Sequence, residues 1–211
     1  ANLLRKPSKT GKGDPYNTVS NLTLMLREDG NFDLWRDEFR QVEMMNGNLV
    51  NDLTWLEVQQ HMETVYQWYW RPGREVLFSA VEHVARERTR NPVEEYLQTL
   101  TWDGVPRCER WLIDSCHLED RMLFRAYARR WMIGLVARVL KPGCKNDVSL
   151  VLSGPQGFGK STVFSTLVDW PGFEHELFND TPIQLGDKDS LLVLHSCLIY
   201  EDSEMASQGV Q

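Results

Sequence analysis

A glycine-rich loop in the last third of the chain constrains the fold more than any other feature. Residues 154–161 read Gly-Pro-Gln-Gly-Phe-Gly-Lys-Ser, which matches the Walker A pattern Gly-x-x-x-x-Gly-Lys-Ser. The apolar run at residues 148–152 predicts a buried strand of a parallel sheet, and residues 162–168 suit a helix. A strand, this loop and a helix in succession predict an α/β fold of the P-loop NTPase class.

The residue types of this loop suit a bound triphosphate. Its three glycines allow the backbone to curl so that successive N–H groups point inward at phosphate oxygens. Lys160 is expected to contact the β- and γ-phosphates, and the Ser161 hydroxyl to bind Mg²⁺. We therefore expect ATP and Mg²⁺ as ligands, held by Gly154, Pro155, Gln156, Gly157, Phe158, Gly159, Lys160, Ser161 and Thr162.

Acidic residues that could complete the site follow an apolar run farther along the chain. The runs at residues 191–194 and 197–200 are both candidate strands, but only the second is followed by carboxylates. The carboxyl ends of parallel strands meet at the edge that holds the loop, so these carboxylates are expected beside the phosphates. One would hold Mg²⁺ and another would orient or deprotonate the attacking water; the sequence does not say which. The expected metal ligands are Ser161, Glu201 and Asp202, and the expected catalytic residues are Lys160, Glu201, Asp202 and Glu204.

The residues before the loop predict smaller helical segments. Asn21 is expected to begin a helix over 21–28, and Thr54 a helix over 55–68. The Asn-Gly pair at 46–47 predicts a hairpin, and residues 75–90 an amphipathic helix. The predicted fold class is α/β, with a helical, winged-helix-like amino-terminal part and a truncated P-loop NTPase domain with a parallel sheet. The predicted divisions are an arm at 1–20, a helical and hairpin module at 21–90, a helical module at 91–143, and an NTPase core at 144–211 that is incomplete at its carboxyl end.

Charge is distributed unevenly along the chain. The net charge is −7, and residues 144–211 account for it with 3 basic and 10 acidic residues. An acidic chain binds DNA poorly unless it carries a local basic patch. Arg121, Arg125 and Arg129 are four residues apart on one predicted helix, so they form three unpaired like charges on one face and are candidate contacts for a nucleic acid or a neighbouring subunit. A solvated helix face explains the same spacing equally well.

Composition excludes several other classes of protein. The four cysteines form no Cys-x-x-Cys pair, and the histidines have no metal-ligand spacing, which argues against a zinc site. No apolar run approaches the roughly 18 to 20 residues that span a bilayer. We therefore expect a protein of the bacterial host cytoplasm with no membrane partner.

The sequence resembles the virulence-associated protein E family of phage, plasmid and genomic-island replication proteins. The resemblance rests on Trp-Asp-Gly-Val-Pro-Arg at 102–107, Lys-Pro-Gly-Cys-Lys at 141–145, the Walker A loop, Gly-Asp-Lys-Asp at 186–189 and Leu-Ile-Tyr-Glu-Asp-Ser-Glu at 198–204, and it extends from about residue 21 to the end. It implies an ATPase related to superfamily-three helicases that works on single-stranded or forked DNA as a homo-oligomeric ring, often beside a primase module. It also implies that Lys188 and Asp189 lie near the nucleotide.

Two departures from the family pattern affect the expected activity. Asp202 stands where the family usually has an apolar residue, and the chain ends seven residues after Glu204. The sensor strand and the trans-acting arginine are expected farther along. Because such an arginine is worth about 10³ to 10⁵ in rate, we expect weak nucleotide binding and slow hydrolysis.

Three functions remain open at the level of the sequence. The first is a DNA-dependent ATPase, a helicase-type motor in the replication of a mobile element. The second is a regulator of replication or packaging whose loop only senses nucleotide. The third is a phosphotransferase, but such enzymes usually carry an arginine-rich lid, and residues 163–204 contain no arginine.

Overall fold

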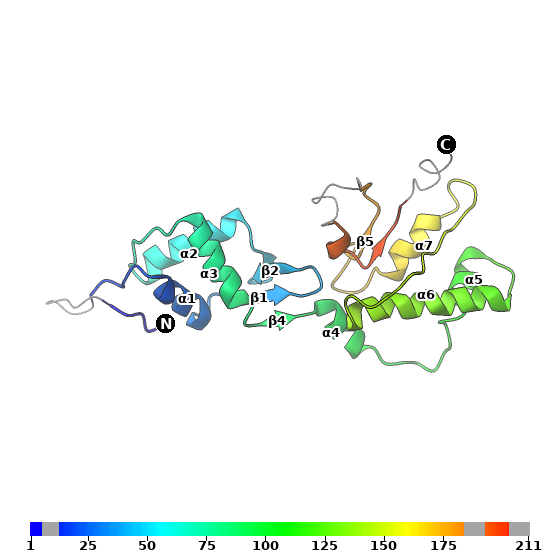
Figure 1. Cartoon of the computed structure of the whole chain (residues 1–211), viewed down its shortest axis with the longest axis horizontal. Helices are drawn as coiled ribbons and strands as arrows, with labels where there is room; N and C mark the ends of the chain where they lie inside the picture. Colours follow the sequence, from blue (N-terminus) through cyan, green and yellow to red (C-terminus); the bar gives the residue numbers. More distant parts are fainter. Residues whose placement is uncertain (6–12, 184–192, 203–211) are drawn as a thin grey trace. The chain divides into compact units, whose positions relative to one another are not determined.

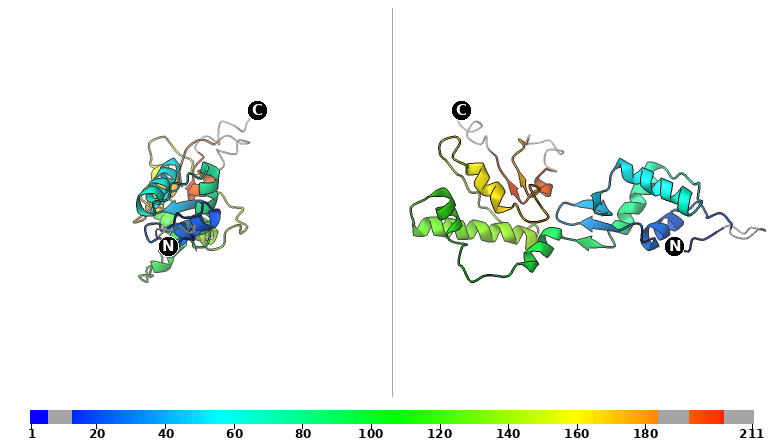
Figure 2. Two further views of the ribbon diagram at one scale, coloured as in Figure 1. Left: turned by 90° about the vertical axis from the view of Figure 1, so that its left-hand side faces the viewer. Right: turned by 180° about the vertical axis from the view of Figure 1, so that it is seen from behind.

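The computed structural model describes residues 1–5, 13–183 and 193–202 (Figures 1 and 2). The chain divides into two compact units, residues 1–92 and residues 93–211. Each unit contains helices and a small sheet, so the chain is of mixed α/β structure.

The amino-terminal unit combines three helices with a four-stranded sheet (Figure 1). The strand order is β3-β2-β1-β4, with β1–β2 and β2–β3 antiparallel and β1–β4 parallel. The hairpin precedes α2 and α3, whereas in a winged helix the wing follows the recognition helix, so the winged-helix expectation is not met. The elements are α1 (Val19–Glu28), β1 (Leu34–Asp37), β2 (Val42–Met45), β3 (Asn48–Leu49), α2 (Asp52–Val65), α3 (Arg74–Ala85) and β4 (Thr89–Arg90).

The Asn-Gly hairpin is confirmed. Asn46 and Gly47 connect β2 to β3 as a two-residue loop, with φ angles of 51° and 80°. Both residues therefore adopt the left-handed conformation that a type I′ turn requires. The Asn46 side chain also ties the turn to the start of β1, because its Oδ1 accepts a hydrogen bond of 2.8 Å from the Asp33 N–H.

Helix α1 begins earlier than the sequence predicted. Thr18 is its N-cap and accepts a hydrogen bond from the Asn21 N–H, so the expectation that Asn21 caps this helix was wrong. Asn21 is instead buried and bonds the backbone of Leu4 in both directions, at 3.0 Å and 2.8 Å. Leu3 joins the core of this unit. The first residues of the predicted arm are therefore packed against the unit rather than fully solvated.

The ends of α2 and α3 also differ from the prediction. Asn51 caps α2 by accepting a hydrogen bond from the Leu53 N–H, and Thr54 is the third helical residue, whose hydroxyl accepts a hydrogen bond from the Asn51 N–H. The cap is thus three residues earlier than expected, in a capping-box arrangement. Helix α3 ends at Ala85, because Thr89 and Arg90 pair with β1 as a parallel strand.

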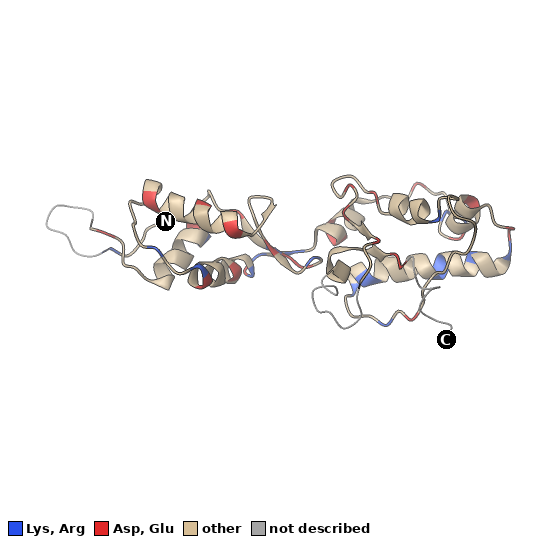
Figure 3. Cartoon of the chain, turned by 90° about the horizontal axis from the view of Figure 1, so that it is seen from above, with Lys and Arg blue, Asp and Glu red and all other residues tan. Residues whose placement is uncertain are grey.

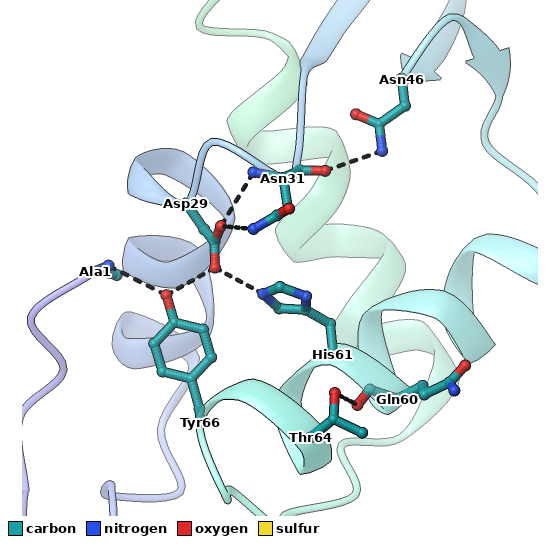
Figure 4. A network of polar contacts seen from close by, with 8 residues as sticks. All are labelled: Ala1, Asp29, Asn31, Asn46, Gln60, His61, Thr64 and Tyr66. Carbon is teal, nitrogen blue, oxygen red and sulfur yellow. Dashed lines mark hydrogen bonds and ion pairs between the residues drawn. The ribbon is translucent and has the colours of Figure 1, made fainter.

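A buried carboxylate links the end of α1 to α2 (Figure 4). Asp29 accepts hydrogen bonds from the His61 ring at 2.7 Å, the Tyr66 hydroxyl at 2.8 Å and both N–H groups of Asn31. Burial by itself raises the pKa of Asp29, but the hydrogen bonds outweigh it and hold the pKa well below the usual range. Burial and the hydrogen bond to Asp29 raise the pKa of the Tyr66 hydroxyl.

We expect Asp29→Asn to lower the free energy of unfolding of this unit by about 2 kcal/mol near neutral pH, because the hydrogen bonds would no longer reach a charged acceptor. The folded pKa of Asp29 lies below its unfolded value of about 3.9, so its contribution is present above about pH 4 and is lost as the pH falls through the folded pKa. The difference in the free energy of unfolding between wild type and variant, measured in urea, should therefore become smaller in acid. Exposed Asp33→Asn is the control, and an equal effect of both substitutions would contradict the prediction.

The carboxyl-terminal unit contains the helices α4 to α7 and a two-stranded parallel sheet (Figure 1). Aromatic contacts connect three of the helices: the Trp131 ring lies 5.2 Å from Trp111 and 5.6 Å from Phe164, measured between ring centroids. The elements are α4 (Pro92–Thr99), α5 (Trp111–Cys116), α6 (Met122–Leu140), α7 (Lys160–Leu167), β5 (Phe178–Asn179) and β6 (Ile199–Tyr200).

The run before the glycine-rich loop does not form the predicted buried strand. Residues 148–152 have no ladder partner among the described residues, so they are not a strand. Val148, Leu150 and Leu152 are half-buried, whereas Ser149 and Val151 are exposed. The segment therefore has the alternation of a strand with one packed face, but it lacks the neighbouring strand that would complete its hydrogen bonds.

Candidate functional site

The glycine-rich loop leads directly into α7. Gly157 and Gly159 have φ angles of 83° and 73°, which bend the backbone as the Walker A pattern predicts, and Gly159 is the N-cap of α7. A Cβ at Gly157 would meet no atom within 4 Å, so the backbone conformation rather than space requires glycine there. The loop thus presents the amino end of a helix, where backbone N–H groups favour an anion.

Lys160 folds back over the loop that it follows. Its Nζ donates hydrogen bonds to the carbonyl oxygens of Gly154 at 2.9 Å and Pro155 at 2.8 Å. These are neutral acceptors at the surface, and phosphate oxygens would be stronger partners for an ammonium group. The side chain of Lys160 is therefore held against the loop.

Ser161 and Glu201 meet although they are 40 residues apart. Ser161 lies in the first turn of α7, Glu201 directly follows β6, and the Ser161 hydroxyl donates a hydrogen bond of 2.7 Å to Glu201 Oε1. The other carboxylate oxygen, Oε2, is buried and has no hydrogen-bond partner among the described residues. A buried charged oxygen without a partner is costly. A hydroxyl beside such a carboxylate is a donor set that fits Mg²⁺.

The sheet fixes the position of this carboxylate. Strand β5 runs parallel to β6, and the Glu201 N–H donates a hydrogen bond of 2.9 Å to the carbonyl oxygen of Asn179. Asn179 is the last residue of β5 and Asp180 follows it, so both lie at the edge of the sheet where Glu201 follows β6. Sequence reasoning missed these two residues, although an apolar pair followed by Asn-Asp was a usable signal.

The other predicted carboxylates have different outcomes. Asp202 lines the same cleft as the loop. Glu204 lies outside the described residues, as do Lys188 and Asp189. The alternative prediction of a strand at 191–194 is wrong for residues 193 and 194, because residues 193–196 are helical.

A cleft of about 900 Å³ separates the loop and residues 148–152 from residues 198–202. Its volume lies within the range of small-molecule sites. Trp131, Leu135 and Arg138 of α6 contribute to its lining, which the sequence did not indicate. Phe158 also lines the cleft, although 77% of its surface is exposed. The predicted loop residues that line the cleft are Gly154, Gln156, Gly157, Phe158, Gly159, Lys160, Ser161 and Thr162.

Comparison with known families assigns this part of the chain. A model of the virulence-associated protein E-like domain matches residues 97–210, which is more than half of the chain and includes the loop, α7 and Glu201. The chain belongs to the virulence-associated protein E-like family. The match begins later than residue 21, where the sequence resemblance was expected to begin. No curated protein matches the chain.

Arg121, Arg125 and Arg129 of the VapE-like domain are not unpaired, so the interpretation of these three residues as unpaired charges was wrong. Each of the three predicted contacts on α6 has a carboxylate partner: Arg121 pairs with Glu119, Arg125 with Asp120 at 2.6 Å, and Arg129 with Glu109 at 3.2 Å. Figure 3 shows basic residues along α6 and acidic residues near them. Hydrogen bonding and the charge of Arg125 lower the pKa of Asp120 to about 2. Mutual repulsion therefore does not call for a DNA phosphate here.

The described part of the chain lacks two other kinds of feature. Within residues 1–5, 13–183 and 193–202, no group of three or more histidine, cysteine, aspartate or glutamate side chains could hold a metal ion by itself. Over the same residues, no helix has both the length and the apolar character that crossing a membrane demands.

Proposed function

We propose that the VapE-like domain binds ATP with Mg²⁺ at the glycine-rich loop and hydrolyses it during the replication of a phage, plasmid or genomic island. The observation that carries this proposal is the hydrogen bond between Ser161 and Glu201, beside a buried carboxylate oxygen without a described partner. It supports a magnesium site at the point where the loop would hold the terminal phosphates.

Each residue would contribute a separate part of the chemistry. The backbone N–H groups at the amino end of α7 would bind the phosphates, and Lys160 would exchange the carbonyls of the loop for phosphate oxygens. Ser161 and Glu201 would hold Mg²⁺, which neutralises charge on the phosphates when it is bound. Asp202 lines the same cleft and would orient the attacking water or accept its proton.

We further propose that hydrolysis drives a helicase-type motor on single-stranded or forked DNA. Membership of the family supports this part of the proposal. The proposal includes the homo-oligomeric ring and the neighbouring primase module that the sequence resemblance implies. Arg121, Arg125 and Arg129 do not support it, because carboxylates already pair with them.

Nucleotide binding is tested most directly by Lys160→Ala. Titration with a fluorescent ATP analogue in the presence of Mg²⁺ should give saturable binding to the wild type. Loss of the ammonium group should weaken this binding by about 100-fold or more. Lys160 would make two charge-assisted hydrogen bonds to phosphate oxygens, and each is worth about 1.5 to 3 kcal/mol. Lys145→Ala is the control, since Lys145 is exposed and pairs with Asp147.

Two results would contradict the proposed function. The first is an absence of binding by the folded wild type. The second is binding that Lys160→Ala leaves unchanged, because the nucleotide would then occupy another site. Phosphate release measured with and without single-stranded DNA would then test the motor, and a wild type that binds ATP without any hydrolysis would favour the sensing role.

A further inference from the structure

The face of α6 that points away from the core carries an exposed apolar stripe. Positions 122, 126, 129, 133, 136 and 140 follow one another at alternating intervals of four and three, which confines them to roughly 80° of the helix circumference. All but Arg129 are apolar: Met122, Ala126, Ile133, Val136 and Leu140. The spacing is that of the contact positions of a coiled coil.

This stripe is not part of the core of its own unit. Met122, Ile133 and Leu140 have 88%, 55% and 52% of their surface exposed. The buried residues of α6 lie on the opposite face of the helix: Ala128, Gly134, Leu135 and Val139. A helix that is apolar on both faces is typical of one that is covered on both faces.

The stripe is hollowed between Met122 and Ile133. The hollow has a volume of about 460 Å³, and Ala126, Arg129 and Arg130 also line it. An apolar side chain from a facing helix inserts into a depression of this kind in knobs-into-holes packing. The surface therefore has the shape of a helix-docking site.

Charge decides which kind of helix fits. Arg125 and Arg129 are neutralised by Asp120 and Glu109, but Arg130, at the edge of the stripe, has no hydrogen bond or ion pair with any residue that the structure describes. In an antiparallel pair of two copies centred near position 131, the two Arg130 side chains would lie on the same side of the seam, offset by about one turn or less. Like charges there are unfavourable, so a carboxylate beside the stripe is the better partner.

We propose that this face of α6 docks an amphipathic helix of a partner protein, whose apolar seam covers the stripe and whose flanking carboxylates pair with Arg130. A DNA phosphate would also meet Arg130, but it would gain nothing from Ile133, Val136 and Leu140. The apolar stripe therefore favours a protein helix over a nucleic acid.

Two designed helical peptides test this surface directly. Both carry leucine at the seam positions; one has glutamate and the other lysine at the flanking positions, and both are fluorescently labelled. In anisotropy titrations with the full chain, we expect the glutamate peptide to bind at least about tenfold more tightly. Ile133→Ser should weaken that binding about tenfold, and Arg130→Glu should reverse the preference in favour of the lysine peptide. Leu100→Ser is the matched control, because Leu100 is 56% exposed outside α6.

Three results would overturn the proposal. In the first, neither peptide binds, or both bind equally. In the second, the wild type sediments as a dimer that Ile133→Ser dissociates, which would identify a second copy as the occupant. In the third, a labelled single-stranded DNA binds, and Arg130→Glu weakens this binding whereas Ile133→Ser does not. That result would identify a nucleic-acid contact. Both substituted side chains are exposed, and circular dichroism would confirm that the variants fold.

Discussion

Glu201→Gln should lower the rate of ATP hydrolysis by about 10² to 10³ while ATP affinity changes only a few-fold. The amide oxygen of glutamine can still accept the hydrogen bond from the Ser161 hydroxyl, so the junction between α7 and β6 should persist. The substitution removes the negative charge that would hold Mg²⁺, and stabilisation of transition-state charge by one such group is worth about 10² to 10³ in rate. Single-turnover phosphate release and an equilibrium titration measure the two quantities separately.

Glu57→Gln provides the matched control for this experiment. It makes the same chemical change at an exposed carboxylate on α2, in the amino-terminal unit. Equal hydrolysis by wild type and Glu201→Gln, in protein that binds ATP normally, would remove Glu201 from the chemistry. A parallel loss of binding in a folded variant would instead assign Glu201 chiefly to nucleotide binding.

Leu77→Ala should destabilise the amino-terminal unit by about 2 to 5 kcal/mol, whereas Val76→Ala should cost less than about 1 kcal/mol. The two residues are neighbours on α3, but Leu77 is 0% exposed and Val76 is 37% exposed. Removing the buried side chain leaves a cavity among the packed residues of α1, α3 and the sheet, whereas the exposed one leaves none. The measurement is the midpoint of urea unfolding, followed by the fluorescence of buried Trp68.

The comparison of these two variants tests the orientation of α3 in the core. The sequence predicts an amphipathic helix over 75–90, and the structure shows that Leu77 faces the core whereas Val76 is exposed. Equal losses of stability from the two substitutions would mean that α3 is rotated from the position described here.

Local chemistry made several features predictable from the sequence. The turn at Asn46 and Gly47 and the bend at Gly159 depend on backbone conformations that neighbouring residues set. The beginning of α7 at Lys160 depends on the same loop. These predictions were correct because few other conformations satisfy those residues.

Other features depended on partners far away in the chain. The segment at Thr89 and Arg90 continues a helical pattern, but pairing with β1 makes it a strand. Arg129 looked unpaired because its partner, Glu109, lies 20 residues earlier. Residues 148–152 have the composition of a buried strand, but no described strand pairs with them. Propensity cannot predict such outcomes, since tertiary contacts decide them.

The sequence alone therefore determined the glycine-rich bend before α7 and the acidic end of the strand that was expected to face it. The tertiary structure decided that Glu201, rather than another carboxylate, meets Ser161, and that Asn179 and Asp180 share its edge of the sheet. It also decided that Arg125 and Arg129 of α6 are paired and that an apolar stripe is exposed on the same helix. The physical reason is range: glycine and turn conformations are set within a few residues, whereas burial and ion pairing depend on which distant segments the fold brings together.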